Sequence, residues 1–135
     1  MAYKIDEIEG IGPAYMEKLA AAKIDNTDHL LEYCGGSKGR KEVAEKTGVS
    51  EKHLLNWANM ADMMRVSGIG PQFAELLEAS GVDTVKELQH RNAANLATKM
   101  EEVNKEKNLA NAIPAESVIE KWIVQAKELK PTISH

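Results

Sequence analysis

The stretch that decides the fold of this chain occurs twice, as IEGIGPAYMEKL at residues 8–19 and as VSGIGPQFAELL at residues 66–77. The two copies are 58 positions apart, and the same register continues as far as Leu30 and Leu88. A second match pairs Trp57 with Trp122 at a shift of 65. The sequence therefore predicts one unit present in two copies, with about two more helical turns in the second.

Each copy places a Gly-Ile-Gly turn directly before a proline, at Pro13 and at Pro71. Proline is favoured at the first position of a helix, where its missing N–H costs nothing. Glycine permits a sharp turn and a close approach of a ligand to the backbone. We therefore expect the amides that open the first of these helices to point outward, where they can bind an anion.

The composition favours a helical protein. Of 135 residues, 43% are hydrophobic but only 4% are aromatic, and scarce aromatic and β-branched residues disfavour sheets. We expect an all-α fold of two repeated units, residues 1–64 and 65–135, with four to five helices each. A unit of this size buries a marginal core alone, so the units should pack together, with Trp57 and Trp122 in the core rather than free to stack on bases. We expect disorder only at the final residues.

The pattern of a hydrophobic residue, glycine, a hydrophobic residue and glycine before a helix resembles the helix-hairpin-helix motif. Each unit also resembles the helical lobe at the N-terminus of recombinases. In the first unit, Gly48-Val49-Ser50 matches the second hairpin of that lobe. The corresponding residues 112–115 of the second unit lack the glycine. From Lys4 to Leu129 the chain resembles a bacterial family of tandem helix-hairpin-helix proteins without an assigned function.

This resemblance implies that hairpin amides hold DNA phosphates, often beside a lysine. Lys18 fits that role in the first unit, whereas Leu76 stands at the matching position of the second. The candidate nucleic-acid-binding residues are Gly10, Gly12, Ala14, Lys18, Lys38, Arg40, Lys41, Gly48, Lys52, Gly68 and Gly70. The alternative, which we weigh equally, is that the glycines only make tight turns between helices.

The charge of the chain limits how it can bind nucleic acid. The formal net charge is −4, and neither unit is basic, so any contact with phosphate must be local. Lys38, Arg40 and Lys41 belong to the most basic stretch, which we expect to border the Gly48 turn. Asp6, Glu7 and Glu9 crowd the first hairpin and would repel phosphate. A mixed run of charges is otherwise typical of a solvated helix face.

Other classes of function find no support in the residues. Cys34 is the only cysteine, so no internal disulfide can form, and the four histidines lack metal-ligand spacing. No catalytic constellation is present, and we expect no enzyme activity, no cofactor and no metal. The sequence shows no signal peptide and no membrane segment, so we expect a cytoplasmic protein.

These observations predict a non-enzymatic module that contacts the sugar-phosphate backbone of nucleic acid without sequence specificity. DNA is the candidate partner, and the sequence does not distinguish it from RNA. The alternative is an adaptor that uses the same scaffold to bind a protein partner. The intact first hairpin favours nucleic acid, whereas the net acidity and the altered second unit favour the adaptor.

Overall fold

The computed structural model describes residues 2–134, and this part of the chain folds into helices and turns without a β-strand. The prediction of an all-α fold is confirmed. The elements are the 3-10 helix η1 (Ile5–Glu7) and the α-helices α1 (Pro13–Ala21), α2 (Thr27–Cys34), α3 (Ser37–Thr47), α4 (Glu51–Met63), α5 (Pro71–Ala79), α6 (Val85–Leu88), α7 (Ala93–Lys107) and α8 (Glu116–Glu128).

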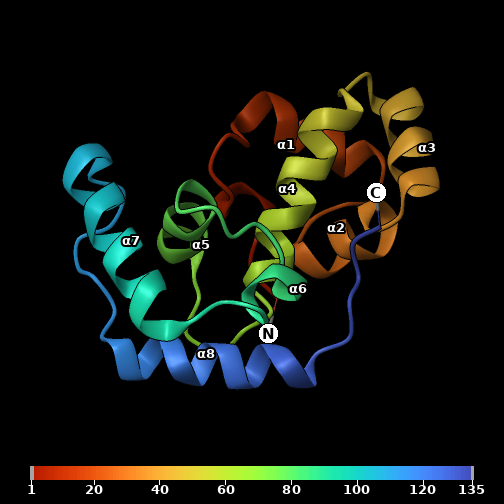
Figure 1. Cartoon of the computed structure of the whole chain (residues 1–135). Coiled ribbons are helices and arrows are strands. Elements are labelled where there is room, and N and C mark those ends of the chain that lie inside the picture. The colour runs from red at the N-terminus through yellow and green to blue at the C-terminus, as the bar shows by residue number, and fades with distance from the viewer. Residues whose placement is uncertain (1, 135) are drawn as a thin grey trace.

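The first half of the chain is built around α4. Helices α2 and α3 pack on α4, and α1 contacts η1 and α3 (Figure 1). Backbone hydrogen bonds fix the N-terminal segment beside the start of α2: the N–H of Ile5 donates to Asp25 O at 3.1 Å, and the N–H of Thr27 donates to Tyr3 O at 2.9 Å. The segment before η1 is therefore held by the α1–α2 connection.

The second half is arranged around α5 and α8. Helices α6 and α7 pack on α8, which runs along one side of the molecule, and α5 contacts α7 (Figure 1). Helix α5 also contacts α4. Because α4 ends at Met63 and α5 begins at Pro71, a short connection joins the two halves and leaves these helices in contact.

One cluster of buried side chains extends through both halves. Trp57 on α4 and Trp122 on α8 belong to it and are only 4% and 2% exposed, which confirms the prediction that both rings lie in the core. Among residues 2–134, every helix is too short or too polar to cross a bilayer.

The C-terminal segment differs from the sequence-based expectation. Disorder was expected at the final residues, but the segment after α8 returns to the corner between α2 and α3 (Figure 1). There the N–H of Ser134 donates to Gly35 O at 2.8 Å, and the hydroxyl of Thr132 donates to Asp62 at 2.9 Å. Contacts with the distant first half order this segment, and no local sequence pattern indicates them.

Candidate nucleic-acid interface

The first turn, Gly10–Pro13, has the backbone that the sequence predicts. Gly10 has φ +95°, in a region that favours glycine. Ile11 is buried, and its N–H donates to Ile8 O at 3.1 Å, which anchors the turn to the core. Pro13 is the first residue of α1, and Gly12 precedes it in an extended conformation. The turn thus ends where the N-terminus of α1 begins.

The amides at this helix start are available to a ligand. Within residues 2–134, the N–H groups of Gly12, Ala14 and Tyr15 donate to no backbone or side-chain acceptor. A Cβ placed on Gly12 would meet nothing within 4 Å, so the turn faces open space. The positive end of the helix dipole lies at the same point. An anion can therefore approach these amides without displacing a protein group.

The second turn, Gly68–Pro71, has nearly the same backbone. Gly68 has φ +96°, and the N–H of the buried Ile69 donates to Val66 O at 3.1 Å. Its surroundings differ, because a Cβ on Gly70 would lie 3.8 Å from the hydroxyl oxygen of Tyr3. Tyr3 comes from the N-terminal segment of the other half. The second turn is therefore partly covered.

A tryptophan stands behind each turn. A Cβ on Gly10 would lie 3.4 Å from Trp57 Nε1, and a Cβ on Gly68 would lie 2.9 Å from Trp122 Nε1. The first glycine of each turn therefore has two roles: it adopts a positive φ, and it leaves room for an indole ring.

Side chains from the first turns of helices α1 and α4 contact each other. The rings of Tyr15 on α1 and His53 on α4 have centroids 5.7 Å apart, and both contact Trp57. His53 stacks on Trp57 at 5.5 Å, and its N–H donates to Ser50 Oγ, the N-cap of α4. Because Tyr15 and His53 are each the third residue of their helix, this contact brings the two helix N-termini together.

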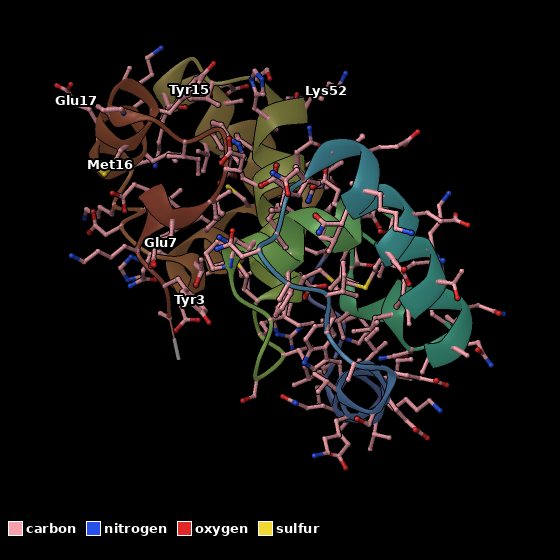
Figure 2. All side chains as sticks on the ribbon, turned by 90° about the vertical axis from the view of Figure 1, so that its left-hand side faces the viewer. Tyr3, Glu7, Tyr15, Met16, Glu17 and Lys52 are labelled. Carbon is pink, nitrogen blue, oxygen red and sulfur yellow. The ribbon has the colours of Figure 1, made fainter. Side chains whose placement is uncertain are left out.

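Two lysines border this pair of helix starts. Lys18 Nζ lies 5.7 Å from the centre of the Tyr15 ring, and Lys52 is exposed in the first turn of α4. Tyr15 and Lys52 both lie along the upper edge of the molecule in Figure 2. Gly48, which ends α3 with φ +77°, faces open space in the turn before α4. We call Gly12, Ala14, Lys18, Gly48 and Lys52 the first-half interface.

The other predicted basic residues lie elsewhere. Lys38, Arg40 and Lys41 occupy the first turn of α3, whereas the Gly48 turn follows its last residue. At a rise of about 1.5 Å per residue, this separates Lys38 from Gly48 by about 15 Å. The expectation that these three residues border the Gly48 turn is therefore wrong: neighbours in the sequence lie at opposite ends of one helix.

Arg40 differs from the two lysines in its surroundings. It was predicted to bind nucleic acid as a surface cation, and in the structure it is only 4% exposed. Its Nη1 donates to Cys34 O at 3.0 Å and to Gly35 O at 2.9 Å, and its Nη2 donates to Ser134 O. The guanidinium is thus occupied by three backbone carbonyls and does not reach solvent as the lysines do.

Carboxylates limit one side of the first turn. Glu9, Glu75 and Glu78 share a hollow of about 210 Å³ with Asn56, Trp57 and Met60. Partial burial, and then the charge of Glu9, raise the pKa of Glu75. Partial burial also raises the pKa of Glu78, with smaller effects from Asp83 and Glu75. These carboxylates disfavour a phosphate on this side of the turn, whereas Lys18 and Lys52 favour one on theirs.

Candidate sites for metal or thiol chemistry among the described residues would be a metal-ligand cluster or the one cysteine. No group of three histidine, cysteine or acidic side chains among residues 2–134 could hold a metal ion. Cys34 is fully buried, and burial raises the pKa of its thiol to about 11. A thiol of that kind is protonated at neutral pH and is a poor nucleophile.

Sequence reasoning pointed to the amide of Tyr15 but did not identify the contact of its ring with His53, nor the place of Tyr3. The sequence could have indicated Tyr15 and His53, because each is the third residue of a helix that follows a glycine turn. Tyr3 gave no such signal, because its position beside Gly70 depends on how the two halves pack.

Comparison with known proteins gives a family for the chain. No curated protein and no solved structure matches it. The model of one family, described as a domain of unknown function (DUF4332), matches residues 9–129. Since this match covers most of the 135 residues, the chain belongs to the DUF4332 family.

Proposed function

We propose that this protein is a non-enzymatic module that binds the sugar-phosphate backbone of DNA through the first-half interface, without reading base sequence. The observation that carries the proposal is the pairing of two helix N-termini, those of α1 and α4, through the contact of Tyr15 with His53. Two adjacent helix starts present several outward amides and two positive dipole ends to one ligand.

We also infer that the two halves are copies of one helix-hairpin-helix unit. In support, both turns have the same glycine φ, the same proline at the helix start and a tryptophan behind the first glycine. On this reading only the first copy retains an uncovered turn with a lysine beside it, and the second copy serves as a packing partner.

The charge distribution sets the expected strength of binding. Lys18 and Lys52 are the two cations at the interface, and the carboxylates around Glu9 oppose phosphate on the other side. Release of counterions by two phosphate contacts gives a log–log salt slope of about −2 on duplex DNA. Binding should therefore be weak and readily reversed by salt.

A protein adaptor is the second candidate, and the covered second turn favours it. Tyr3 beside Gly70 and the buried Leu76 at the lysine position leave that turn poorly suited to phosphate. If no DNA or RNA binding occurs even at low salt, where phosphate contacts are strongest, the adaptor becomes the better reading.

The test uses a substitution that occupies the free amides after the first turn while the protein stays folded. Aspartate is a favoured N-cap residue. The carboxylate introduced by Gly12→Asp should accept hydrogen bonds from the free amides of α1, and the variant should be at least as stable as the parent protein. We expect Gly12→Asp to weaken binding to a labelled 20-base-pair DNA at least about tenfold, about 1.4 kcal/mol, as measured by fluorescence anisotropy.

Two matched variants complete the design. Gly70→Asp adds the same charge to the second turn and should weaken binding far less. Gly12→Ser caps the amides without adding a charge and should weaken binding nearly as much as Gly12→Asp. Equal losses from Gly12→Asp and Gly70→Asp would contradict the assignment to the first half.

A further inference from the structure

Residues 130–134, which we call the C-terminal strap, cross from α8 to the first half of the chain (Figure 1). Four hydrogen bonds hold the strap. Thr132 Oγ1 donates to Asp62 Oδ1 at 2.9 Å and accepts from Arg65 Nη1 at 3.4 Å. Ser134 N donates to Gly35 O at 2.8 Å, and Arg40 Nη2 donates to Ser134 O. Ile133 packs against the core between these contacts. The strap thus reaches the corner between α2 and α3.

This corner accommodates the strap closely. A Cβ on Gly35 would collide with the carbonyl oxygen of Thr132, and a Cβ on Gly36 would lie 3.8 Å from Ser134 Oγ. Asp62, which receives the hydroxyl of Thr132, is buried and also accepts hydrogen bonds from Arg65 and from the N–H of Val85. Asp62 is therefore fixed independently of the strap.

Within residues 2–134, the guanidinium that the strap contacts has backbone carbonyls as its hydrogen-bond partners. Arg40 donates to the carbonyls of Cys34, Gly35 and Ser134, and no carboxylate among residues 2–134 lies within ion-pair distance of it. A hydrogen bond from a guanidinium to an anionic oxygen is stronger than one to a carbonyl. A phosphate group can therefore compete with Ser134 O for Arg40.

The strap is also lightly held. Thr132 and Ser134 are exposed, and Ile133 is only half-buried. Segments with few buried contacts open at a small fraction of the free energy of global unfolding. Lys38 and Lys41 are exposed on the same first turn of α3 as Arg40. Opening would therefore add one cation to two that already face solvent.

We propose that the C-terminal strap is an autoinhibitory contact that withholds Arg40 from nucleic-acid phosphate. When the strap is closed, Ser134 O occupies the guanidinium. When it opens, Arg40 joins Lys38 and Lys41 in a second phosphate-binding surface at the start of α3. This inference shares with the proposed function only the ligand, the DNA backbone, because it uses no residue of the first-half interface.

The test weakens the strap in the full chain by Ile133→Ser, with Val124→Ser as the control. Val124 is 56% exposed on α8, and both variants replace a β-branched aliphatic residue by serine without changing the charge. Hydrogen exchange of the Ser134 amide reports opening directly, and Ile133→Ser should accelerate it about tenfold. The same variant should bind duplex DNA more tightly, with a log–log salt slope steeper by about 1. Val124→Ser should change neither quantity.

Two further combinations test where the gain in DNA affinity of Ile133→Ser arises. Adding Lys38→Gln and Lys41→Gln should remove this gain in affinity. Adding Gly12→Asp should leave the gain in place. Survival of the gain with Gly12→Asp separates this inference from the first-half interface. Faster exchange of Ser134 with unchanged or weaker DNA binding would overturn autoinhibition. Unchanged exchange in both Ile133→Ser and Thr132→Val would show that the strap does not open separately, and would overturn the proposal as well.

Discussion

The first and second turns have almost the same backbone, with φ of +95° at Gly10 and +96° at Gly68 and a proline at each helix start. What surrounds them differs. Gly12 faces open space, whereas Gly70 lies beside the hydroxyl of Tyr3. A repeated sequence has thus produced the same local geometry twice, while the packing of the halves places Tyr3 beside the second turn and leaves the first turn uncovered.

One residue near the end of α1 and its counterpart on α5 show why the surroundings of the two turns differ. Lys18 on α1 is exposed, whereas its counterpart Leu76 on α5 is fully buried. Helix α5 lies between α4 and α7, and α1 lies at the edge of the molecule (Figure 1). Leu76 therefore serves the core, and a lysine at that position would have to bury its charge.

The largest expected effect tests whether the tryptophans are equivalent. Trp57→Ala and Trp122→Ala should each destabilise the protein by about 3–5 kcal/mol, because a buried ring leaves a cavity. Urea denaturation followed by circular dichroism measures this. A large loss for one variant and a negligible loss for the other would show that the two rings do not have matching roles.

The next effect distinguishes Gly10 from Gly68, the first glycines of the two turns. Gly10→Ala should cost about 1–2 kcal/mol, because an alanine with positive φ is strained. Gly68→Ala should cost about 1 kcal/mol more, because its Cβ would also crowd Trp122, an overpacked contact. The same urea titration compares them. A costlier Gly10→Ala would contradict the tighter fit of Gly68 against its indole.

A third effect concerns binding. Lys18→Gln combined with Lys52→Gln should weaken duplex DNA binding about tenfold at low salt and reduce the log–log salt slope from about −2 toward zero. Fluorescence anisotropy at several salt concentrations measures the slope. Lys99→Gln with Lys121→Gln removes the same charge from exposed positions of the second half and should leave the slope unchanged. A flatter slope in that control would place the contacts in the wrong half.

The smallest effect concerns Glu78, in the hollow between the halves. Its pKa is raised in the folded protein, so the stability that its protonated form contributes is present at low pH and is lost as the pH rises through the folded pKa. Glu78→Gln should therefore raise the melting temperature at pH 7. The corresponding gain in the free energy of unfolding should be within about 0.5 kcal/mol.

The pH dependence provides the check on this last effect. The gain from Glu78→Gln should vanish in acid, below the ordinary glutamate pKa of about 4.3, because Glu78 is then protonated in both states. Glu102→Gln, at an exposed position of α7, is the control and should show no such trend. A Glu78→Gln gain that is the same at both pH values would indicate packing rather than charge.

Local patterns in the sequence were sufficient to predict much of the fold. The helical class, the turns at Gly10 and Gly68 and the burial of Trp57 and Trp122 all follow from glycine, proline and hydrophobic spacing. These features depend on interactions within a few residues along the chain or within one helix face. The same reasoning indicated the open amides after Gly12, because a helix start leaves them unbonded.

What could not be predicted depends on contacts between distant segments. Arg40 looked like a surface cation, but it binds Ser134 O, 94 positions away. Tyr3 covers Gly70 because the halves pack together. The basic stretch that begins at Lys38 was expected at the Gly48 turn, but the length of α3 separates the two. Composition and spacing carry no information about such pairings.

The central claim is that the first turn is open to backbone phosphate and the second is not. The most direct measurement is a titration of ¹⁵N-labelled protein with short duplex DNA at low salt, followed through amide chemical shifts in NMR spectra. The account predicts the largest, saturable shifts at Gly12, Ala14 and Tyr15, with small shifts at Gly70, Gln72 and Phe73. Equal shifts at both turns, or binding that leaves Gly12, Ala14 and Tyr15 unperturbed, would contradict it.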